Sequence, residues 1–212
     1  MERREFVRTG ATAAFTMAGV DMAGVDMHVP AMNTESATFA LDYAPHFGMF
    51  RQSAGADVVD QLRFMHDQGF RSLEDNGMRG RPVAEQEKIG AELKRLGMRM
   101  GVFVINPDTA WTMTFAAGEA SFRESFLKDI DASIEVAKRV GATWATVVMG
   151  TVAPKLEPEY QTANAVEILR AAAERCEKAG LVMVLEPLNR RDHPSMFLTR
   201  VPQTFQICRA VN

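Results

Sequence analysis

A chain of 212 residues can bury one sizeable core, and 47% apolar with 24% charged residues is ordinary for a soluble globular protein. The net charge of −3 and the scattered Lys and Arg residues argue against nucleic-acid binding and a polybasic membrane patch, and no apolar stretch reaches the length of a membrane span. Cys176 and Cys208 lie far apart without CxxC spacing, so we expect two free thiols rather than a disulfide framework.

Residues 1–35 differ in kind from the rest of the chain. The pair Arg3-Arg4 precedes a run of small, mostly apolar residues at 9–20. This order resembles a twin-arginine (Tat) export signal, with cleavage near Ala31, and it predicts an exported, periplasmic protein. The alternative is a disordered or helical tail on a cytoplasmic protein, which the two Asp residues of the Met-Ala-Gly-Val-Asp repeat at 17–26 favour.

From residue 36 onward, one unit recurs: a β-rich run, a polar loop, a helix with apolar residues every three or four positions, and a glycine. The predicted strands are Thr38–Tyr43, Phe70–Glu74, Arg99–Ile105, Thr143–Met149 and Val182–Glu186. Each helix before the next strand should end at a glycine, because glycine adopts the left-handed C′ conformation at little cost: Gly69, Gly97, Gly141 and Gly180. A sixth helix is predicted at Pro202–Ala210.

The predicted strands are nearly continuous in apolar residues, which is typical of a parallel sheet covered by helices. Alternating strands and helices leave a (β/α) barrel or a doubly wound open sheet. Neither a GxGxxG motif nor a P-loop is present, so we predict the barrel. Residues 36–212 hold about five βα units and a sixth helix, so we expect an incomplete (β/α)8 TIM barrel of the α/β class.

Polar residues follow the predicted strands where each strand ends. They include His46, Glu74, Asn106, Thr151 and the pair Glu186 and Asn189. Loops are polar in any case, but the active sites of barrels lie at the carboxyl ends of their strands. The recurrence of these endings therefore favours one shared site.

Glu186 is the sharpest feature, because it closes the apolar run Val182–Pro187. A carboxylate at the end of a buried strand is costly unless it is paired, protonated or bound to a cation. A divalent cation with oxygen ligands would stabilise it, and so would Arg190 or Arg191 nearby in the sequence. From the spacing of the residues alone, a bound cation and an arginine partner are equally well supported.

The segment Val182–Asp192 reads Val-Met-Val-Leu-Glu-Pro-Leu-Asn-Arg-Arg-Asp. This segment resembles the hydroxypyruvate isomerase branch of the xylose-isomerase-like barrels, and the stretches 44–48, 70–76 and 161–164 are similar to the same branch. The resemblance implies a divalent metal, Mg²⁺ or Mn²⁺, and proton transfer between adjacent carbons of a small hydroxycarbonyl substrate. Glu186 matches the glutamate that serves that family as metal ligand and acid/base residue. The family's other ligands and its second catalytic glutamate come from strands six to eight, which this sequence lacks.

Supporting roles are predicted for several polar residues near the strand ends. The candidate substrate-binding residues are His46, Glu74, Asn106, Asn189, Arg190 and His193. Each has an ordinary alternative as a turn, cap or solvated loop residue. Trp111 and Phe115, in the loop after the third strand, could form a wall over the site or simply cover the rim.

Two further functions stay open besides the isomerase. A ketose 3-epimerase of the same superfamily would share the fold, the metal and Glu186, and a fragment or sugar-binding barrel would have no activity. A zinc endonuclease barrel would need more His ligands than the four present. The sequence does not fix the oligomeric state, and a homo-oligomer remains one of the options.

The export signal can be tested directly. We expect residues 1–40, fused to a reporter, to direct it to the periplasm, and replacement of Arg3 and Arg4 by Lys to keep it in the cytoplasm, because the signal depends on the arginine pair. A reporter whose location is the same with either pair would contradict the prediction.

Overall fold

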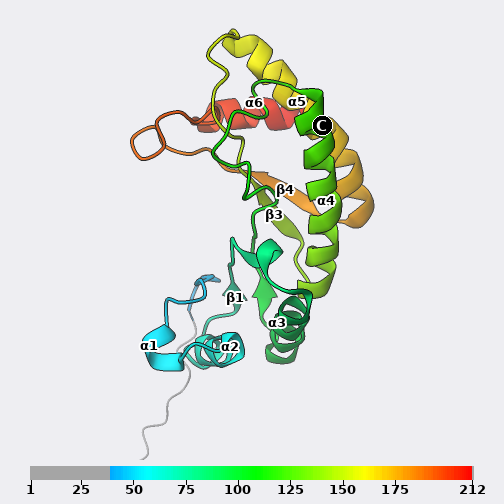
Figure 1. The fold of residues 1–212 in the computed structure, drawn as a ribbon. Helices are drawn as coiled ribbons and strands as arrows, with labels where there is room; N and C mark the ends of the chain where they lie inside the picture. The colour runs from blue at the N-terminus through cyan, green and yellow to red at the C-terminus, as the bar shows by residue number, and fades with distance from the viewer. Residues whose placement is uncertain (1–38, 212) are drawn as a thin grey trace, which may run out of the picture. The chain divides into compact units, whose positions relative to one another are not determined.

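The computed structural model describes residues 39–211, so the predicted leader at 1–35 and its export signal lie outside the described residues. The helices are α1 (Arg51–Ala54), α2 (Val58–Asp67), η1 (Met78–Gly80), α3 (Val83–Leu96), α4 (Ala120–Val140), α5 (Pro158–Ala179) and α6 (Val201–Val211) (Figure 1). The strands are β1 (Ser72–Leu73), β2 (Arg99–Met100), β3 (Trp144–Val147) and β4 (Val182–Leu185). No helix in this part of the chain is long and apolar enough to cross a membrane.

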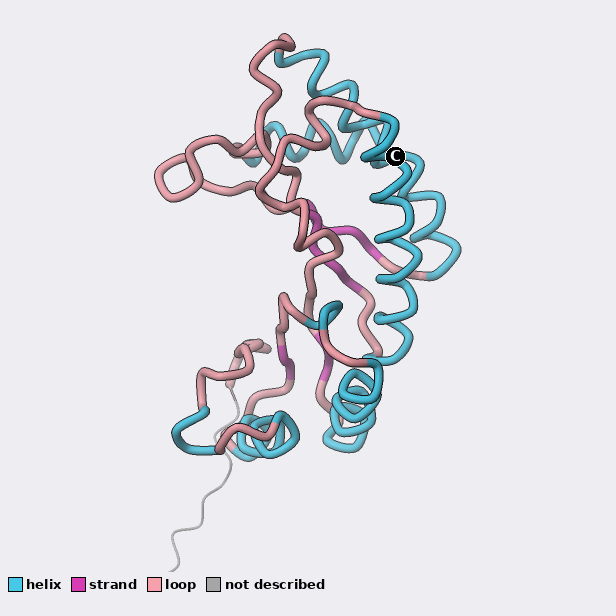
Figure 2. Tube along the Cα trace, in the orientation of Figure 1, coloured by secondary structure: helices cyan, strands magenta, loops and turns pink. Residues whose placement is uncertain are grey.

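The strands pair in parallel and in chain order. Strand β1 pairs with β2 in the register Ser72↔Arg99, and β3 pairs with β4 from Trp144↔Val182 to Val147↔Leu185. A parallel pair requires a crossover connection, and α3 and α5 provide the two crossovers within these pairs. The predicted alternation of parallel strands and helices is therefore confirmed, and Figure 2 shows it along the chain.

Residues 101–105 connect the two strand pairs into one continuous ladder. The N–H of Gly101 donates to Leu73 O (2.7 Å) on one side. On the other side, Thr146 N–H donates to Phe103 O (2.7 Å), and Ile105 N–H donates to Thr146 O (2.9 Å). This segment bonds to both neighbours in turn, and the carboxyl ends of all the strands consequently meet at one edge.

The first predicted strand is wrong. Residues 39–43 form no strand, and Tyr43 N–H instead bonds Leu41 O in a tight turn. Pairing with the β1 segment begins only at Pro45, whose carbonyl accepts from Glu74 N–H (3.1 Å), and at the bridge His46↔Glu74. The sixth helix is confirmed as α6, and Gly97, Gly141 and Gly180 end their helices in the left-handed conformation as predicted.

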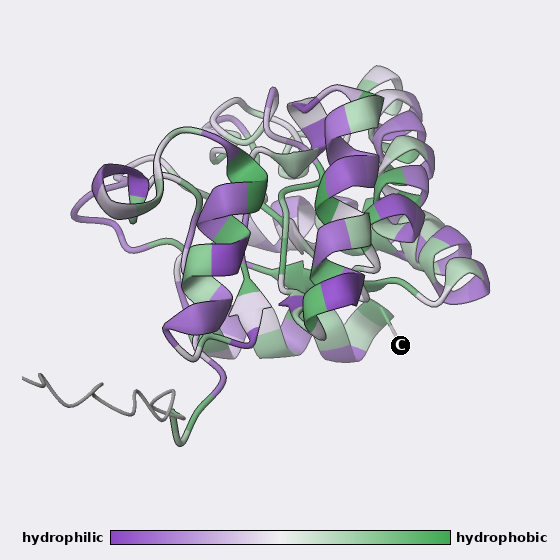
Figure 3. Cartoon of the chain, turned by 90° about the horizontal axis from the view of Figure 1, so that it is seen from below, coloured by the Kyte–Doolittle hydropathy of each residue, from purple (hydrophilic) through white to green (hydrophobic). Residues whose placement is uncertain are grey.

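The core lies between the strands and the helices that cover them. Helix α4 buries Phe126 and Ile130 in the same apolar cluster as Phe103, Ile105 and Val147. The helices carry apolar and polar residues side by side (Figure 3), as amphipathic helices on a sheet do. This packing fixes the strands, and with them the loops that leave their carboxyl ends.

Gly90 sets how closely α3 and α4 pack. A Cβ at this position would lie 2.0 Å from the carbonyl oxygen of Arg139 in α4. Alanine normally favours a helix over glycine by about 1 kcal/mol, but this clash is with backbone and outweighs the gain. We expect Gly90→Ala to lower the free energy of unfolding by about 1–3 kcal/mol, as overpacking does.

The matched control is Gly80→Ala, because a Cβ there meets nothing within 4 Å. Its effect should stay within about 0.5 kcal/mol, the usual range for surface substitutions. Urea denaturation of both variants measures the difference, and equal stabilities would show that the helices can move apart freely.

Glu92 of α3 bonds Arg63 of α2 and also Arg95 of its own helix. Its carboxylate accepts from Arg63 Nε (2.8 Å) and from Arg95 Nε and Nη2 (2.8 and 2.7 Å), and these bonds lower the pKa of Glu92 to about 2, with Arg95 the larger cause. A lowered folded-state pKa means stability that is fully present above the ordinary glutamate pKa of about 4.5 and lost as pH falls towards 2.

We therefore expect Glu92→Gln to be less stable than wild type at pH 7, and the gap in stability between them to narrow steadily as the pH falls from about 4.5 towards 2. Glu135→Gln is the control, because Glu135 pairs with Lys138 on an exposed face and such pairs contribute little. Urea titrations at several pH values check both, and a pH-independent gap for Glu92→Gln would contradict the ion-pair explanation.

Candidate active site at the carboxyl ends of the strands

A cavity of about 460 Å³ opens at the carboxyl ends of the strands. Its lining comes from the loops after β1, β2 and β4 and from the residue that follows β3. The lining residues are Asn76, Gly77, Val104, Pro107, Ala110, Trp111, Val148, Glu186, Leu188 and His193. The position is the one at which barrels build their active sites.

Glu186 enters this cavity directly from the end of β4. Its N–H donates to Val147 O (3.2 Å), which continues the β3–β4 ladder by one step. Side chains alternate along a strand, and Met183 and Leu185 line a different cavity, beside α5. Glu186 therefore belongs with Val184 to the face turned away from α5.

The expectation that Glu186 is a buried charge is wrong, because its side chain is exposed. The arginine alternative also fails among the described residues. The ion pairs found within residues 39–211 do not include Glu186, and Arg190 Nε instead donates to Thr199 Oγ1 (3.2 Å). The carboxylate is left accessible to whatever enters the cavity.

Trp111 and His193 form one wall of the cavity. Their rings stack with centroids 5.1 Å apart and planes 26° apart, although they lie 82 positions apart in the sequence. Trp111 is 57% exposed. Phe115, predicted as a second wall residue, is fully buried in the core against Phe122 and Phe126.

Asn106 supports the cavity through the backbone of Val148, one of the lining residues. Its side chain is fully buried, Nδ2 donates to Val148 O (2.8 Å), and Oδ1 accepts from Val148 N–H (3.2 Å). The amide thus joins the loop after β2 to the end of β3. Contact with a substrate would require it to release Val148, so the geometry favours a positioning role over the predicted binding role.

The remaining predicted residues lie outside the cavity lining. His46 Nε2 and Glu74 Oε1 are 3.7 Å apart, so these two side chains face each other beside β1. Asn189 Oδ1 accepts from the N–H groups of Arg191 and Asp192, both at 3.0 Å, which makes it a turn residue. Of the predicted site residues, the cavity therefore brings together Glu186 and His193.

Asn76 also lines the cavity. It follows β1 by three positions and is one of the polar residues that end this predicted strand, but it was not among the predicted substrate-binding residues. Val148 carried no such signal, because an apolar residue in an apolar strand looks like core.

The described residues do not fit a complete metal centre. Within residues 39–211, no group of three or more His, Cys, Asp and Glu side chains could hold a metal ion. Hard divalent cations take about six oxygen ligands, and Glu186 supplies one carboxylate. No step of the chemistry can therefore be routed through a metal from these residues.

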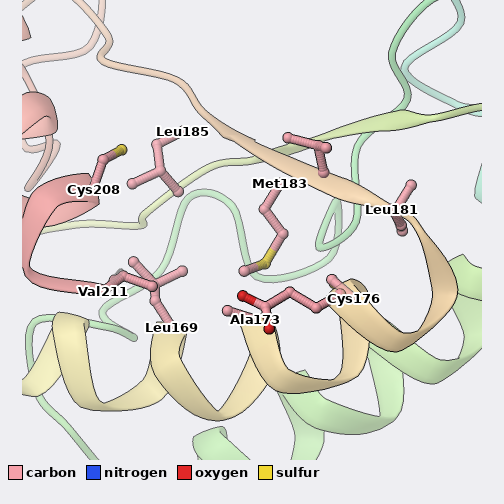
Figure 4. Close-up of a pocket in the computed structure, with 10 residues that line it drawn as sticks. Leu169, Ala173, Cys176, Leu181, Met183, Leu185, Cys208 and Val211 are labelled. Atoms are coloured by element: carbon pink, nitrogen blue, oxygen red, sulfur yellow. The ribbon is translucent and has the colours of Figure 1, made fainter.

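A second cavity, of about 250 Å³, lies between α5, β4 and α6 (Figure 4). Apart from Glu177, its lining is apolar or thiol, with Met183, Leu185 and Cys176 among its members. Cys176 and Cys208 are free, and burial raises the pKa of Cys176 to about 11, so its thiol stays protonated. With no converging polar groups, this cavity offers no chemistry comparable to that at Glu186.

Comparisons with known proteins place the fold. An AP endonuclease of family 2 from Brucella melitensis aligns with a TM-score of 0.65 at 19% identity, over 80% of this chain and 64% of that one. A D-psicose 3-epimerase from Clostridium cellulolyticum H10 gives 0.64 at 13% identity, over 81% and 60%. An IOLI protein, whose structure holds a zinc atom, gives 0.61 at 13% identity, over 80% and 59%.

In each of these pairs the chain covers less than two thirds of the solved structure, and at these identities the likeness shows the fold alone. A search among curated proteins finds no match. The sequence profile of the xylose isomerase-like TIM barrel family, however, matches residues 53–212, which is most of the chain. Together with the parallel ladder and the cavity at its carboxyl end, this match shows that the chain belongs to the xylose isomerase-like TIM barrel family.

Proposed function

We propose that the chain is the part of a sugar isomerase that carries one of its proton-transferring glutamates, and that its substrate is a small hydroxycarbonyl compound of the hydroxypyruvate type. The observation that carries this proposal is the accessible carboxylate of Glu186 in the cavity at the end of β4, which has no ion-pair partner within residues 39–211. Family membership and the resemblance of residues 182–192 to hydroxypyruvate isomerases support it.

The proposed reaction begins when Glu186 removes a proton from the hydroxyl-bearing carbon beside the carbonyl. The C–H electron pair forms a carbon–carbon double bond, and the carbonyl π pair moves to oxygen, giving an ene-diolate. Return of a proton to the former carbonyl carbon, with transfer of the other hydroxyl's proton to the former carbonyl oxygen, yields the aldehyde isomer. A carboxylate that moves a proton in this way contributes about 10²–10⁴ in rate.

Mg²⁺ or Mn²⁺ belongs to the proposal as the cofactor expected for this family. The described residues do not complete a site for it, so the steps above are assigned to Glu186 alone. His193 and Asn76 line the same cavity and are candidates for hydrogen bonds to substrate oxygens. His46, Glu74, Asn106, Asn189 and Arg190 keep only the status of predictions.

A ketose 3-epimerase is the second candidate. A cavity of about 460 Å³ has room for a ketose as well as for hydroxypyruvate. The first proton transfer would be the same, but the proton would return to the carbon that lost it, on its other face. The two functions therefore differ in which carbon receives the proton, and a sugar-binding barrel would move no proton at all.

We expect Glu186→Gln to lower kcat/KM by about 10²–10⁴, because the amide keeps the size of the side chain but cannot accept the proton. The assay is interconversion of hydroxypyruvate and tartronate semialdehyde with added Mg²⁺ or Mn²⁺. It should be run on the 212-residue chain and on a chimaera extended by the last βα units of a family member. Glu74→Gln, a change of the same kind outside the cavity lining, is the control and should cost far less.

Near-normal turnover and metal affinity in Glu186→Gln would refute the assignment of Glu186. A wild-type protein that ignores hydroxypyruvate but exchanges the C3 proton of a ketose with solvent would replace the isomerase with the epimerase. If calorimetry shows sugar binding but the extended protein turns over neither substrate, the chain belongs to a sugar-binding barrel without activity.

A further inference from the structure

Three loop segments join above the strand ends into a small sheet, here called the rim sheet (residues 112–113, 150–152 and 195–197). Thr151 is its centre, since it bridges Met113 on one side and Met196 on the other. Thr151 N–H donates to Thr112 O (2.9 Å), Val152 N–H donates to Ser195 O (3.0 Å), and Phe197 N–H donates to Gly150 O (2.9 Å).

The rim sheet explains why Trp111 meets His193. Trp111 directly precedes the first outer segment, and His193 lies two residues before the second. The middle segment, which follows β3, is bonded to both. The stack that walls the Glu186 cavity is thus held through 150–152, whose residues do not line the cavity themselves.

Gly150 is where this arrangement tolerates no side chain. Its φ is +69°, and a Cβ would lie 2.2 Å from Thr114 Oγ1 and 2.3 Å from the backbone oxygen of Thr112. Contacts under 3 Å with backbone cannot be relieved by a rotamer change. Either the 112–114 segment or the 150–152 segment must move, and both movements separate the Trp111 loop from the His193 loop.

We propose that Gly150 is a positioning residue for the cavity wall: the absence of a side chain lets the loop after β2 come close enough to the end of β3 for Trp111 to stack on His193. The proposal adds to the proposed function a residue that acts on substrate binding through Trp111 and His193. Only its kinetic consequence rests on that function, because the stack itself can be observed without activity.

The direct readout is the ¹H NMR spectrum of the histidine rings. The chain has four histidines, and the indole ring current should shift the ring protons of His193 upfield. Trp111→Ala should abolish the shift, and His193→Ala should remove the signal and so assign it. In Gly150→Ala the shift should be lost or strongly reduced.

Gly141→Ala is the matched control. Gly141 has nearly the same φ, +70°, but a Cβ there meets nothing within 4 Å, and it ends α4 before β3, whereas the rim-sheet segment with Gly150 follows β3. Both variants bear the cost of a left-handed alanine, whereas only Gly150→Ala bears the clash. The His193 shift should therefore be unchanged in Gly141→Ala.

Thr114→Leu enlarges the side chain that lies against Gly150 and leaves Gly150 itself, with its backbone conformation, unchanged. It should also reduce the shift, whereas Thr114→Ser, which keeps the Oγ atom, should not. These two variants decide the matter if Gly150→Ala does not fold. A folded Gly150→Ala, or in its absence a folded Thr114→Leu, that retains the full His193 shift would overturn the proposal.

The kinetic consequence is a rise in KM larger than the fall in kcat, since Glu186 stays on β4 while the wall moves. Loss of the NMR shift with unchanged KM would overturn the link to substrate binding but leave the positioning of the stack intact. Absence of any turnover in wild type would instead count against the proposed function, and the NMR result would stand apart from it.

Discussion

The site depends on one backbone constraint, the hydrogen bonding of residues 101–105 to both neighbouring strands. Gly101 bonds Leu73, whereas Phe103 and Ile105 bond Thr146, so one extended segment sets the relative heights of four strand ends. Peptide groups in such a ladder cannot slip by one residue without turning every side chain to the other face. The placement of Glu186 in the same cavity as Trp111 and Val148 follows from this register and from its continuation in the β3–β4 pair.

Much of the fold was predictable because it rests on local patterns. Apolar runs, helical periodicity and terminal glycines such as Gly141 each depend on neighbours in the sequence. The prediction of the first strand was wrong because the chain turns at Leu41 and pairs with the β1 segment only from Pro45 onward. That pairing depends on hydrogen bonds to residues distant in the sequence. Glu186 was identified for a partly wrong reason, since it is exposed rather than a buried charge.

The rest of the site could not be predicted from spacing, because its members meet through the rim sheet. The stacking of Trp111 on His193 requires three loops to converge, and no local pattern encodes that convergence. Asn106 was overpredicted as a binding residue, because it is a polar residue after an apolar strand. Its amide instead hydrogen-bonds both the C=O and the N–H of Val148.

The two hydrogen bonds from the Asn106 side chain to the Val148 backbone, here called the Asn106 clamp, hold this edge of the sheet, whereas other residues line the cavity. One amide satisfies both the N–H and the C=O of Val148, so the start of the loop after β2 is attached with little need of residues 107–111. Pro107, Ala110 and Trp111 lie just beyond the clamp and line the cavity. Evolution can therefore retune this stretch for a new substrate while the anchor holds, which gives the scaffold a built-in place for diversification.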